Sequence, residues 1–87
     1  MTRRIAWRPR ALAELETIDT RNPTMARRIR DAVAVSVDDE HGDVQKLSGG
    51  RDLYRLRVGD WRVLFTIESH GQLKAILRVL NRRDAYR

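Results

Sequence analysis

Hydrophobic and polar residues follow regular spacings along most of the 87-residue chain, and these spacings predict its elements in order. Residues 3–8 alternate between apolar and polar side chains, which predicts a first strand. Pro9 suits the first position of a helix, and Asn22 and Pro23 suit the cap and first residue of a second helix that ends near Asp39. The helical stripes are Ala11, Leu12, Leu15 and Ile18 in the first helix and Met25, Ile29, Ala32, Val33, Ser36 and Val37 in the second.

Beyond the helices the period changes from helical to alternating. Residues 38–43 are mostly polar and contain a glycine, which predicts a loop. Residues 44–50 end in two glycines, and we interpret them as a connector. Three alternating segments bounded by turn residues then predict strands at 53–58, 61–67 and 73–79.

The turn Gly59-Asp60 joins the first two of these strands. It is a two-residue hairpin loop with glycine first, as a type II′ turn prefers. The turn fixes the register, so that Arg57 lies opposite Arg62. One face of the hairpin is then apolar and is expected to cover the helices, and it carries Tyr54, Leu56, Val58, Trp61, Val63 and Phe65. The other face carries Arg55, Arg57 and Arg62.

The last strand follows a turn at His70-Gly71. Its alternation predicts Leu73, Ala75, Leu77 and Val79 on the apolar face, with Lys74 and Arg78 on the same side as the arginines. Together these elements predict one α+β domain over residues 1–87. Its two N-terminal helices are expected to pack on one face of a four-stranded, largely antiparallel twisted sheet.

The opposition of Arg57 and Arg62 has two interpretations. Like charges directly opposite each other on a sheet cost about 0.2–1 kcal/mol, so a hairpin optimised only for folding places another residue at one of these positions. A bound anion relieves the repulsion, and arginines supply many protein contacts to phosphate. The alternative is that both side chains extend apart into water at almost no cost. Spacing alone leaves both interpretations open.

Charge is concentrated in the same part of the chain. The sequence has 18 basic and 12 acidic residues, a net charge of +6, and 16 of the basic residues are arginine. Residues 1–50 hold nine basic and eight acidic side chains, whereas residues 51–87 hold nine and four. Arginine binds phosphate through two parallel hydrogen bonds, so a polyanionic partner is predicted. Acidic proteins and anionic lipids also fit a basic surface, and we interpret Glu14 as an ordinary charge on the surface of a helix.

Several classes of protein are excluded by composition. The chain has no cysteine and two histidines far apart in sequence, so neither a disulfide nor a zinc site is expected, and no cofactor is implied. No apolar run approaches the roughly 20 residues of a membrane-spanning helix. No basic and apolar leader opens the sequence, so we expect the protein in the cytoplasm and without a membrane partner.

The order strand, two helices and three strands, with YRLRVGDWRVLF and then VLNRRDAYR, resembles the RelE branch of the RelE/ParE toxin superfamily. The resemblance covers nearly the whole chain and is most specific in residues 54–65 and 79–87. It implies an endoribonuclease of a toxin–antitoxin system that cuts mRNA in the decoding site of the ribosome. It also implies a cognate antitoxin that wraps and neutralises the toxin, with operator DNA contacted only through the antitoxin complex.

The resemblance assigns roles residue by residue. The catalytic set it implies is Arg55, Arg57, Arg62, Arg82 and Tyr86. In the family chemistry the ribose 2′-OH attacks the adjacent phosphate, which requires a base, cations for the phosphate charge and an acid for the 5′ oxygen. Arg62 and Arg82 match the electrostatic role with Arg57 assisting, and Tyr86 matches a residue that stacks on a base or donates a proton. Further phosphate contacts are expected from Lys74, Arg78, Arg83 and Arg87.

The sequence departs from the family pattern at two positions. Many relatives have a lysine on the strand before the hairpin turn, or a histidine before the tail arginine, where this chain has Arg55 and Asn81. Arginine has a pKa above about 12 and is a poor general base, and an asparagine amide does not pass on a proton. Two other functions therefore remain open beside mRNA cleavage: a ParE-like inhibitor of DNA gyrase, and a non-catalytic module that binds nucleic acid or an antitoxin.

Overall fold

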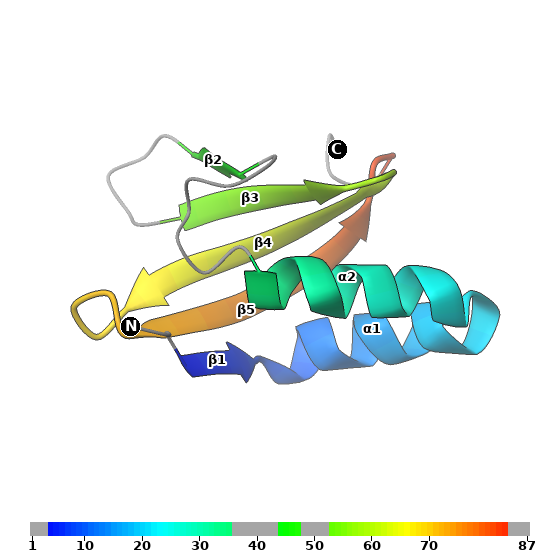
Figure 1. Ribbon diagram of the computed structural model, residues 1–87, viewed down its shortest axis with the longest axis horizontal. Helices are drawn as coiled ribbons and strands as arrows, with labels where there is room; N and C mark the ends of the chain where they lie inside the picture. Colours follow the sequence, from blue (N-terminus) through cyan, green and yellow to red (C-terminus); the bar gives the residue numbers. More distant parts are fainter. Residues whose placement is uncertain (1–3, 36–43, 48–52, 84–87) are drawn as a thin grey trace.

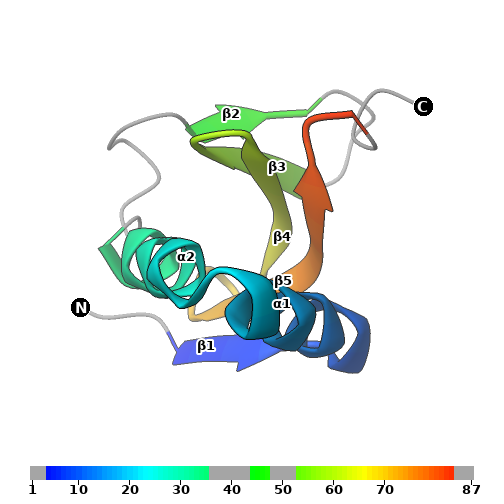
Figure 2. The same cartoon turned by 90° about the vertical axis from the view of Figure 1, so that its right-hand side faces the viewer.

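The computed structural model describes residues 4–35, 44–47 and 53–83. Two helices lie side by side on one side of a curved sheet, as Figure 1 and the view turned by 90° in Figure 2 both show. The helices are α1 (Pro9–Arg21) and α2 (Pro23–Val35). The strands are β1 (Arg4–Trp7), β2 (Val44–Lys46), β3 (Leu53–Val58), β4 (Trp61–Glu68) and β5 (Leu73–Asn81).

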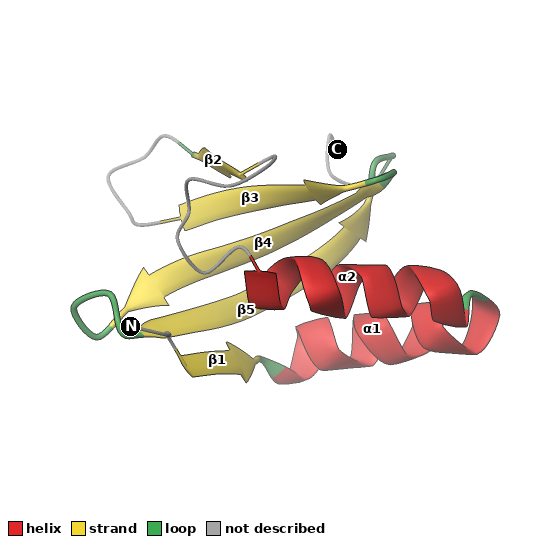
Figure 3. Cartoon of the chain, viewed as in Figure 1, coloured by secondary structure: helices red, strands yellow, loops and turns green. Residues whose placement is uncertain are grey.

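The sheet has the strand order β1-β5-β4-β3-β2 (Figure 3). β1 runs parallel to β5, and every other neighbouring pair is antiparallel. The predicted α+β class, with two helices on one face of a largely antiparallel sheet, is confirmed. The count of four strands is wrong, because the segment predicted as a connector contributes β2. This three-residue strand pairs with β3, and it is too short for its alternation to be recognised in the sequence.

The predicted helix boundaries at Pro9 and Asn22-Pro23 are confirmed. Asn22 serves both helices, because its backbone N–H donates to the Ile18 carbonyl at 2.6 Å and its side-chain Oδ1 accepts from the Met25 N–H at 3.1 Å. A polar cap of this kind satisfies one of the free N–H groups at the start of α2. The structure describes α2 as far as Val35. The predicted extension to residue 39 lies outside the described residues.

The β3–β4 hairpin has the predicted register, with Arg57 opposite Arg62 and Tyr54 opposite Phe65. Gly59 has a φ of +58°, whereas Asp60 is not among the described residues with positive φ. One positive φ at the first turn position, followed by a negative one, is the pattern of a type II′ turn. The glycine is therefore required by the backbone conformation of the turn.

The core lies between the helices and the sheet. Its buried members come from both helices and three strands: Ala11, Leu15, Ile18, Ala26, Ile29, Val33, Leu56, Val58, Val63, Phe65, Ile76 and Val79. Tyr54 stacks on Phe65 at the edge of this cluster, with the ring centroids 5.3 Å apart. Leu12 was predicted in the stripe of α1, but it is 43% exposed, so the stripe is narrower than expected.

The β4–β5 ladder contains an irregularity that reverses the predicted face of half of β5. Leu64 pairs with Arg78 and Phe65 with Ile76, so Leu77 is an extra residue on β5. Val79 stays on the core face as predicted, but before the bulge Ile76 and Lys74 face the helices instead of Leu77, Ala75 and Leu73.

Lys74 is therefore not on the arginine face, and the prediction that it contacts phosphate there is wrong. Its side chain is 0% exposed. Its Nζ donates to the Val33 carbonyl of α2 at 3.3 Å and lies 4.7 Å from the centroid of the Phe65 ring. Helix carbonyl and aromatic face both favour the ammonium group, which is consistent with a lysine at a core position.

Candidate functional site

The outer face of the β3–β4 hairpin carries three arginines that the register brings together. Arg57 is exposed and lies directly opposite Arg62. Arg55 is two residues away on β3 and is partly buried. Its Nη2 donates to the Gln45 side-chain oxygen at 2.7 Å, so the short strand β2 orients one of the arginines. Gln45 was missed in the sequence because β2 itself was missed.

Arg62 has a different environment from the solvent-facing position expected for it. The residue is only 7% exposed. Its guanidinium folds back on its own turn, where Nη1 donates to the Gly59 carbonyl at 3.2 Å and to the Trp61 carbonyl at 3.1 Å. The alternative in which both arginines extend apart into water therefore does not hold for Arg62, whose Nη1 donates to main-chain carbonyls of the turn.

The end of β5 reaches the same turn. Asn81 pairs with Trp61, and the Arg82 N–H donates to the Asp60 carbonyl at 2.6 Å. This bond anchors the main chain of Arg82 beside the turn that holds the Arg62 guanidinium. The side chains of Arg82 and Arg83 are exposed. Tyr86 and Arg87, the other predicted tail residues, lie outside the described residues.

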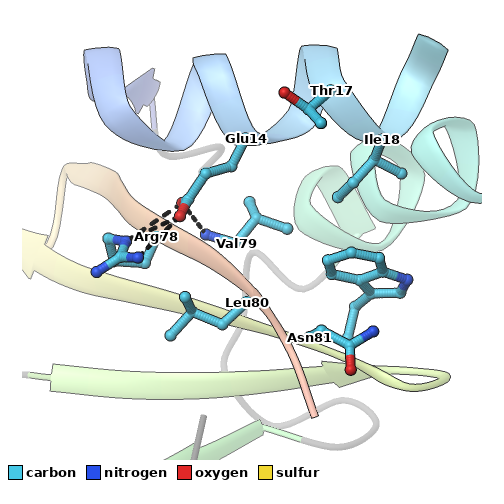
Figure 4. A pocket seen from close by; sticks show the side chains of 8 residues that line it. Glu14, Thr17, Ile18, Arg78, Val79, Leu80 and Asn81 are labelled. Carbon is cyan, nitrogen blue, oxygen red and sulfur yellow. Dashed lines mark hydrogen bonds and ion pairs between the residues drawn. The ribbon is translucent and has the colours of Figure 1, made fainter. Parts of the chain in front are cut away.

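Arg78 takes part in a contact that the sequence did not predict. It lies opposite Leu64 in the ladder, but its guanidinium reaches Glu14 of α1, with Nη2 to Oε2 at 2.9 Å and Nε to the same oxygen at 3.1 Å. The other carboxylate oxygen, Oε1, accepts from the Val79 N–H at 2.7 Å (Figure 4). Glu14 thus ties the helix to the part of β5 that lies beyond its pairing with β1.

Glu14 was interpreted as a surface charge. It lies 64 residues from Arg78 in the sequence, and no sequence signal marks their ion pair. Because Glu14 occupies the Nε–Nη2 edge of the Arg78 guanidinium, that edge is not available to a phosphate in this arrangement. We therefore do not retain it among the phosphate contacts.

A groove lies next to this ion pair, between α1 and the end of β5. One part has a volume of about 270 Å³ and is lined by Glu14, Thr17, Ile18, Trp61, Arg78, Val79, Leu80 and Asn81 (Figure 4). An adjoining part of about 350 Å³ is lined by Thr17, Ile18, Arg21, Asn22, Met25, Trp61 and Asn81. Trp61 faces the helix side of the sheet, opposite to the side of Arg62. The groove and the arginine face are therefore on different sides of the sheet.

The described part of the arginine face contains cations but no group suited to take a proton. His70 is exposed in the turn after β4, at the far end of an eight-residue strand from the Gly59-Asp60 turn. Eight residues of strand span roughly 25 Å, so His70 does not reach Arg57, Arg62 or Arg82 near that turn. His41 lies outside the described residues. The described residues also contain no group of three His, Cys, Asp or Glu side chains that could hold a metal ion.

The comparisons with known proteins agree on one superfamily. The family model described as "ParE toxin of type II toxin-antitoxin system, parDE" matches residues 5–86. No curated protein sequence is a significant match. Neither α1 nor α2 is long and apolar enough to cross a membrane, and these are the helices of the described part of the chain.

Solved structures give the same result for the fold. RelE in the archaeal RelE–RelB complex from Pyrococcus horikoshii OT3 is 28% identical with a TM-score of 0.76, covering 94% of this chain and 97% of that one. The YoeB/ParE toxin from Agrobacterium tumefaciens is 14% identical with a TM-score of 0.77, covering 90% and 96%. The isolated Escherichia coli RelE toxin is 15% identical with a TM-score of 0.75, covering 92% and 84%.

Proposed function

Because the chain belongs to the ParE toxin family of type II toxin–antitoxin systems, within the RelE/ParE superfamily, we propose a specific activity for its arginine face. The toxin cleaves mRNA on the ribosome and thereby stops translation. One observation carries this proposal: Arg57 and Arg62 lie directly opposite each other, and Arg82 is anchored at the same turn. Three cations at one end of a sheet suit an RNA backbone, in which each phosphodiester carries one negative charge.

The proposed reaction is attack of the ribose 2′-OH on the adjacent phosphate, which leaves a cyclic phosphate and a free 5′-OH. Arg62 and Arg82 stabilise the charge that builds up on the phosphate oxygens, and exposed Arg57 assists. Tyr86 stacks on a base or supplies the proton for the 5′ oxygen. Because no side chain on the described part of the face can act as a general base, the rate acceleration comes from positioning and charge stabilisation.

The proposed partners follow from the same assignment. The archaeal relative was crystallised with RelB, and we propose a cognate antitoxin for this chain as well. The ribosome and mRNA are the proposed targets, and operator DNA is contacted only through the antitoxin complex. A short acidic reading frame beside the gene is the candidate for the antitoxin.

A second candidate function is inhibition of DNA gyrase, and the family model favours it because its description names ParE. The arginine cluster argues for RNA, since ParE-like toxins generally lack the combination of Arg57, Arg62, Arg82 and Tyr86. A non-catalytic module is the third alternative, supported by Arg55 and Asn81 at the positions where relatives have candidate bases.

Induced expression separates these functions. We expect growth to stop together with protein synthesis, with cleaved ribosome-bound mRNA and unchanged plasmid supercoiling. Trapped gyrase–DNA cleavage complexes would establish the second function instead, and unimpaired growth the third.

Single substitutions test the site within the same assay. We expect Arg62→Ala or Arg82→Ala to abolish toxicity while antitoxin binding is retained. The matched control is Arg30→Ala, which removes an exposed arginine of α2, 3.8 Å from Asp19 and on the helix side of the sheet. Full toxicity of both site variants would remove the site assignment.

A further inference from the structure

Three consecutive main-chain carbonyls of the β3–β4 turn each accept a hydrogen bond from an arginine of the candidate site. The carbonyls of Gly59 and Trp61 accept from Nη1 of Arg62, at 3.2 and 3.1 Å. The carbonyl between them, of Asp60, accepts from the backbone N–H of Arg82 at 2.6 Å. One turn thus fixes a guanidinium and, beside it, the main chain that carries a second arginine.

The hydrogen bonds of the Arg62 guanidinium to the turn come from Nη1, which leaves the Nε–Nη2 edge for a ligand. A guanidinium has five N–H groups, and the two on Nη1 are directed to the turn carbonyls. The N–H of Nε and those of Nη2 make no further hydrogen bond within the part of the chain that the structure describes. Nε and the adjacent Nη2 hydrogen form the side edge of the guanidinium, which matches two oxygens of a phosphate.

We propose that the β3–β4 turn is a positioning element for an anion site, and that Gly59 is its positioning residue. The turn carbonyls hold Arg62 by Nη1 and so present its Nε–Nη2 edge, with Arg82 alongside, to one phosphate group. Arg62 is 7% exposed, so little water competes with the turn carbonyls for the hydrogens of its Nη1. The identification of that phosphate with mRNA rests on the proposed function, whereas the positioning itself does not.

The turn type decides the direction of the Gly59 carbonyl. Types II′ and I′ differ in the orientation of the central peptide, and only II′ confines the positive φ to the first position. In this structure Gly59 alone of the two turn residues has a positive φ. The pair Asn-Gly favours type I′ strongly and keeps a two-residue hairpin. Replacing Gly59-Asp60 by Asn-Gly therefore preserves the register but turns the carbonyl of position 59 away from Arg62.

The test compares the double variant Gly59→Asn/Asp60→Gly with Asp60→Asn. Both lose the same negative charge, but Asp60→Asn keeps Gly59 and its turn type. In NMR spectra of the full chain, we expect the Arg62 Nε and Nη signals to be dispersed and to respond to added inorganic phosphate in wild type and Asp60→Asn. In the double variant, we expect the chemical shifts of these signals to move toward those of free arginine. The thermal midpoint of unfolding is expected to stay the same or rise. Identical Arg62 signals in the two variants would overturn the proposal.

RNA binding supplies the functional measurement. With a short single-stranded RNA, the double variant is expected to bind about tenfold more weakly than Asp60→Asn, with a slope of log affinity against log salt smaller by about 1. A variant that is merely less stable keeps the wild-type slope. If the spectra change as expected but induced wild type cleaves no ribosome-bound mRNA, the proposed function fails and the positioning stands. If wild type binds RNA and the double variant binds with equal affinity and slope, the positioning role is overturned.

Discussion

Lys74 and Arg57 show that position in the fold, and not charge, decides which residues of this chain can meet a polyanion. Lys74 is 0% exposed and donates to the Val33 carbonyl, whereas Arg57 is exposed on the outer face. We expect Lys74→Met to leave the salt dependence of RNA binding unchanged, since the ammonium contacts no phosphate. Arg57→Met also removes one positive charge. We expect it to make the negative slope of log affinity against log salt shallower by about 1. Equal slopes for the two variants would contradict this distinction.

Glu14 is an error of the opposite kind to Lys74. It was interpreted as an ordinary surface charge, but it connects α1 to β5. It accepts from Arg78 and from the Val79 N–H at 2.7 Å. Hydrogen bonds to charged groups contribute about 1.5–3 kcal/mol when partly shielded from water. The Glu14 side chain is 23% exposed, so we expect Glu14→Ala to lower the free energy of unfolding by about 1–3 kcal/mol, measured by urea titration.

Glu14→Gln is the matched control for that loss. The amide oxygen of the glutamine still accepts from the Val79 N–H. Glu14→Gln is therefore expected to lose about half as much free energy of unfolding as Glu14→Ala. A Glu14→Ala variant as stable as wild type would mean that water replaces the carboxylate at no cost, as it does at many surface ion pairs.

At the scale of elements, Asn22 joins α1 to α2 with a single residue. Its Oδ1 accepts from the Met25 N–H at 3.1 Å, which is the bond of an N-cap. We expect Asn22→Ala to reduce the free energy of unfolding by about 0.5–2 kcal/mol, whereas Asn22→Ser retains most of it because the serine hydroxyl also accepts this bond. Circular dichroism during denaturation measures both. A loss of the same size in both variants would show that the cap bond is not the cause.

The elements that the sequence predicts well are those governed by local chemistry. Pro9, Asn22 and the Gly59-Asp60 turn act on their own neighbours, so the helix starts and the Arg57–Arg62 register follow from spacing. The errors lie where distant segments decide the outcome. The bulge that turns Lys74 inward depends on how β5 meets β4, and β2 exists only because β3 is there to pair with it. The same holds for the candidate site: the arginines are predicted, but the carbonyls around Arg62 are not.

At the scale of the whole molecule, the sheet separates two surfaces. The arginine face lies on its outer side, and the groove beside Trp61 and Ile18 lies on the helix side. The net charge of +6 adds a field that acts over the whole protein, whichever surface a partner contacts. An RNA and an acidic protein are both attracted by this field, and the two surfaces allow them to be distinguished by mutation.

The field predicts how salt affects assembly with the proposed antitoxin. For an acidic partner, electrostatic attraction raises the association rate constant, and salt screens it over about 8–10 Å at physiological ionic strength. We expect the association rate of the purified toxin with the product of the adjacent acidic reading frame to fall at least tenfold between low and high salt. The dissociation rate should change much less, because short-range contacts set it. Stopped-flow fluorescence of Trp7 and Trp61 measures the first rate. An association rate independent of salt would show that the basic charge of this chain serves RNA and not its protein partner.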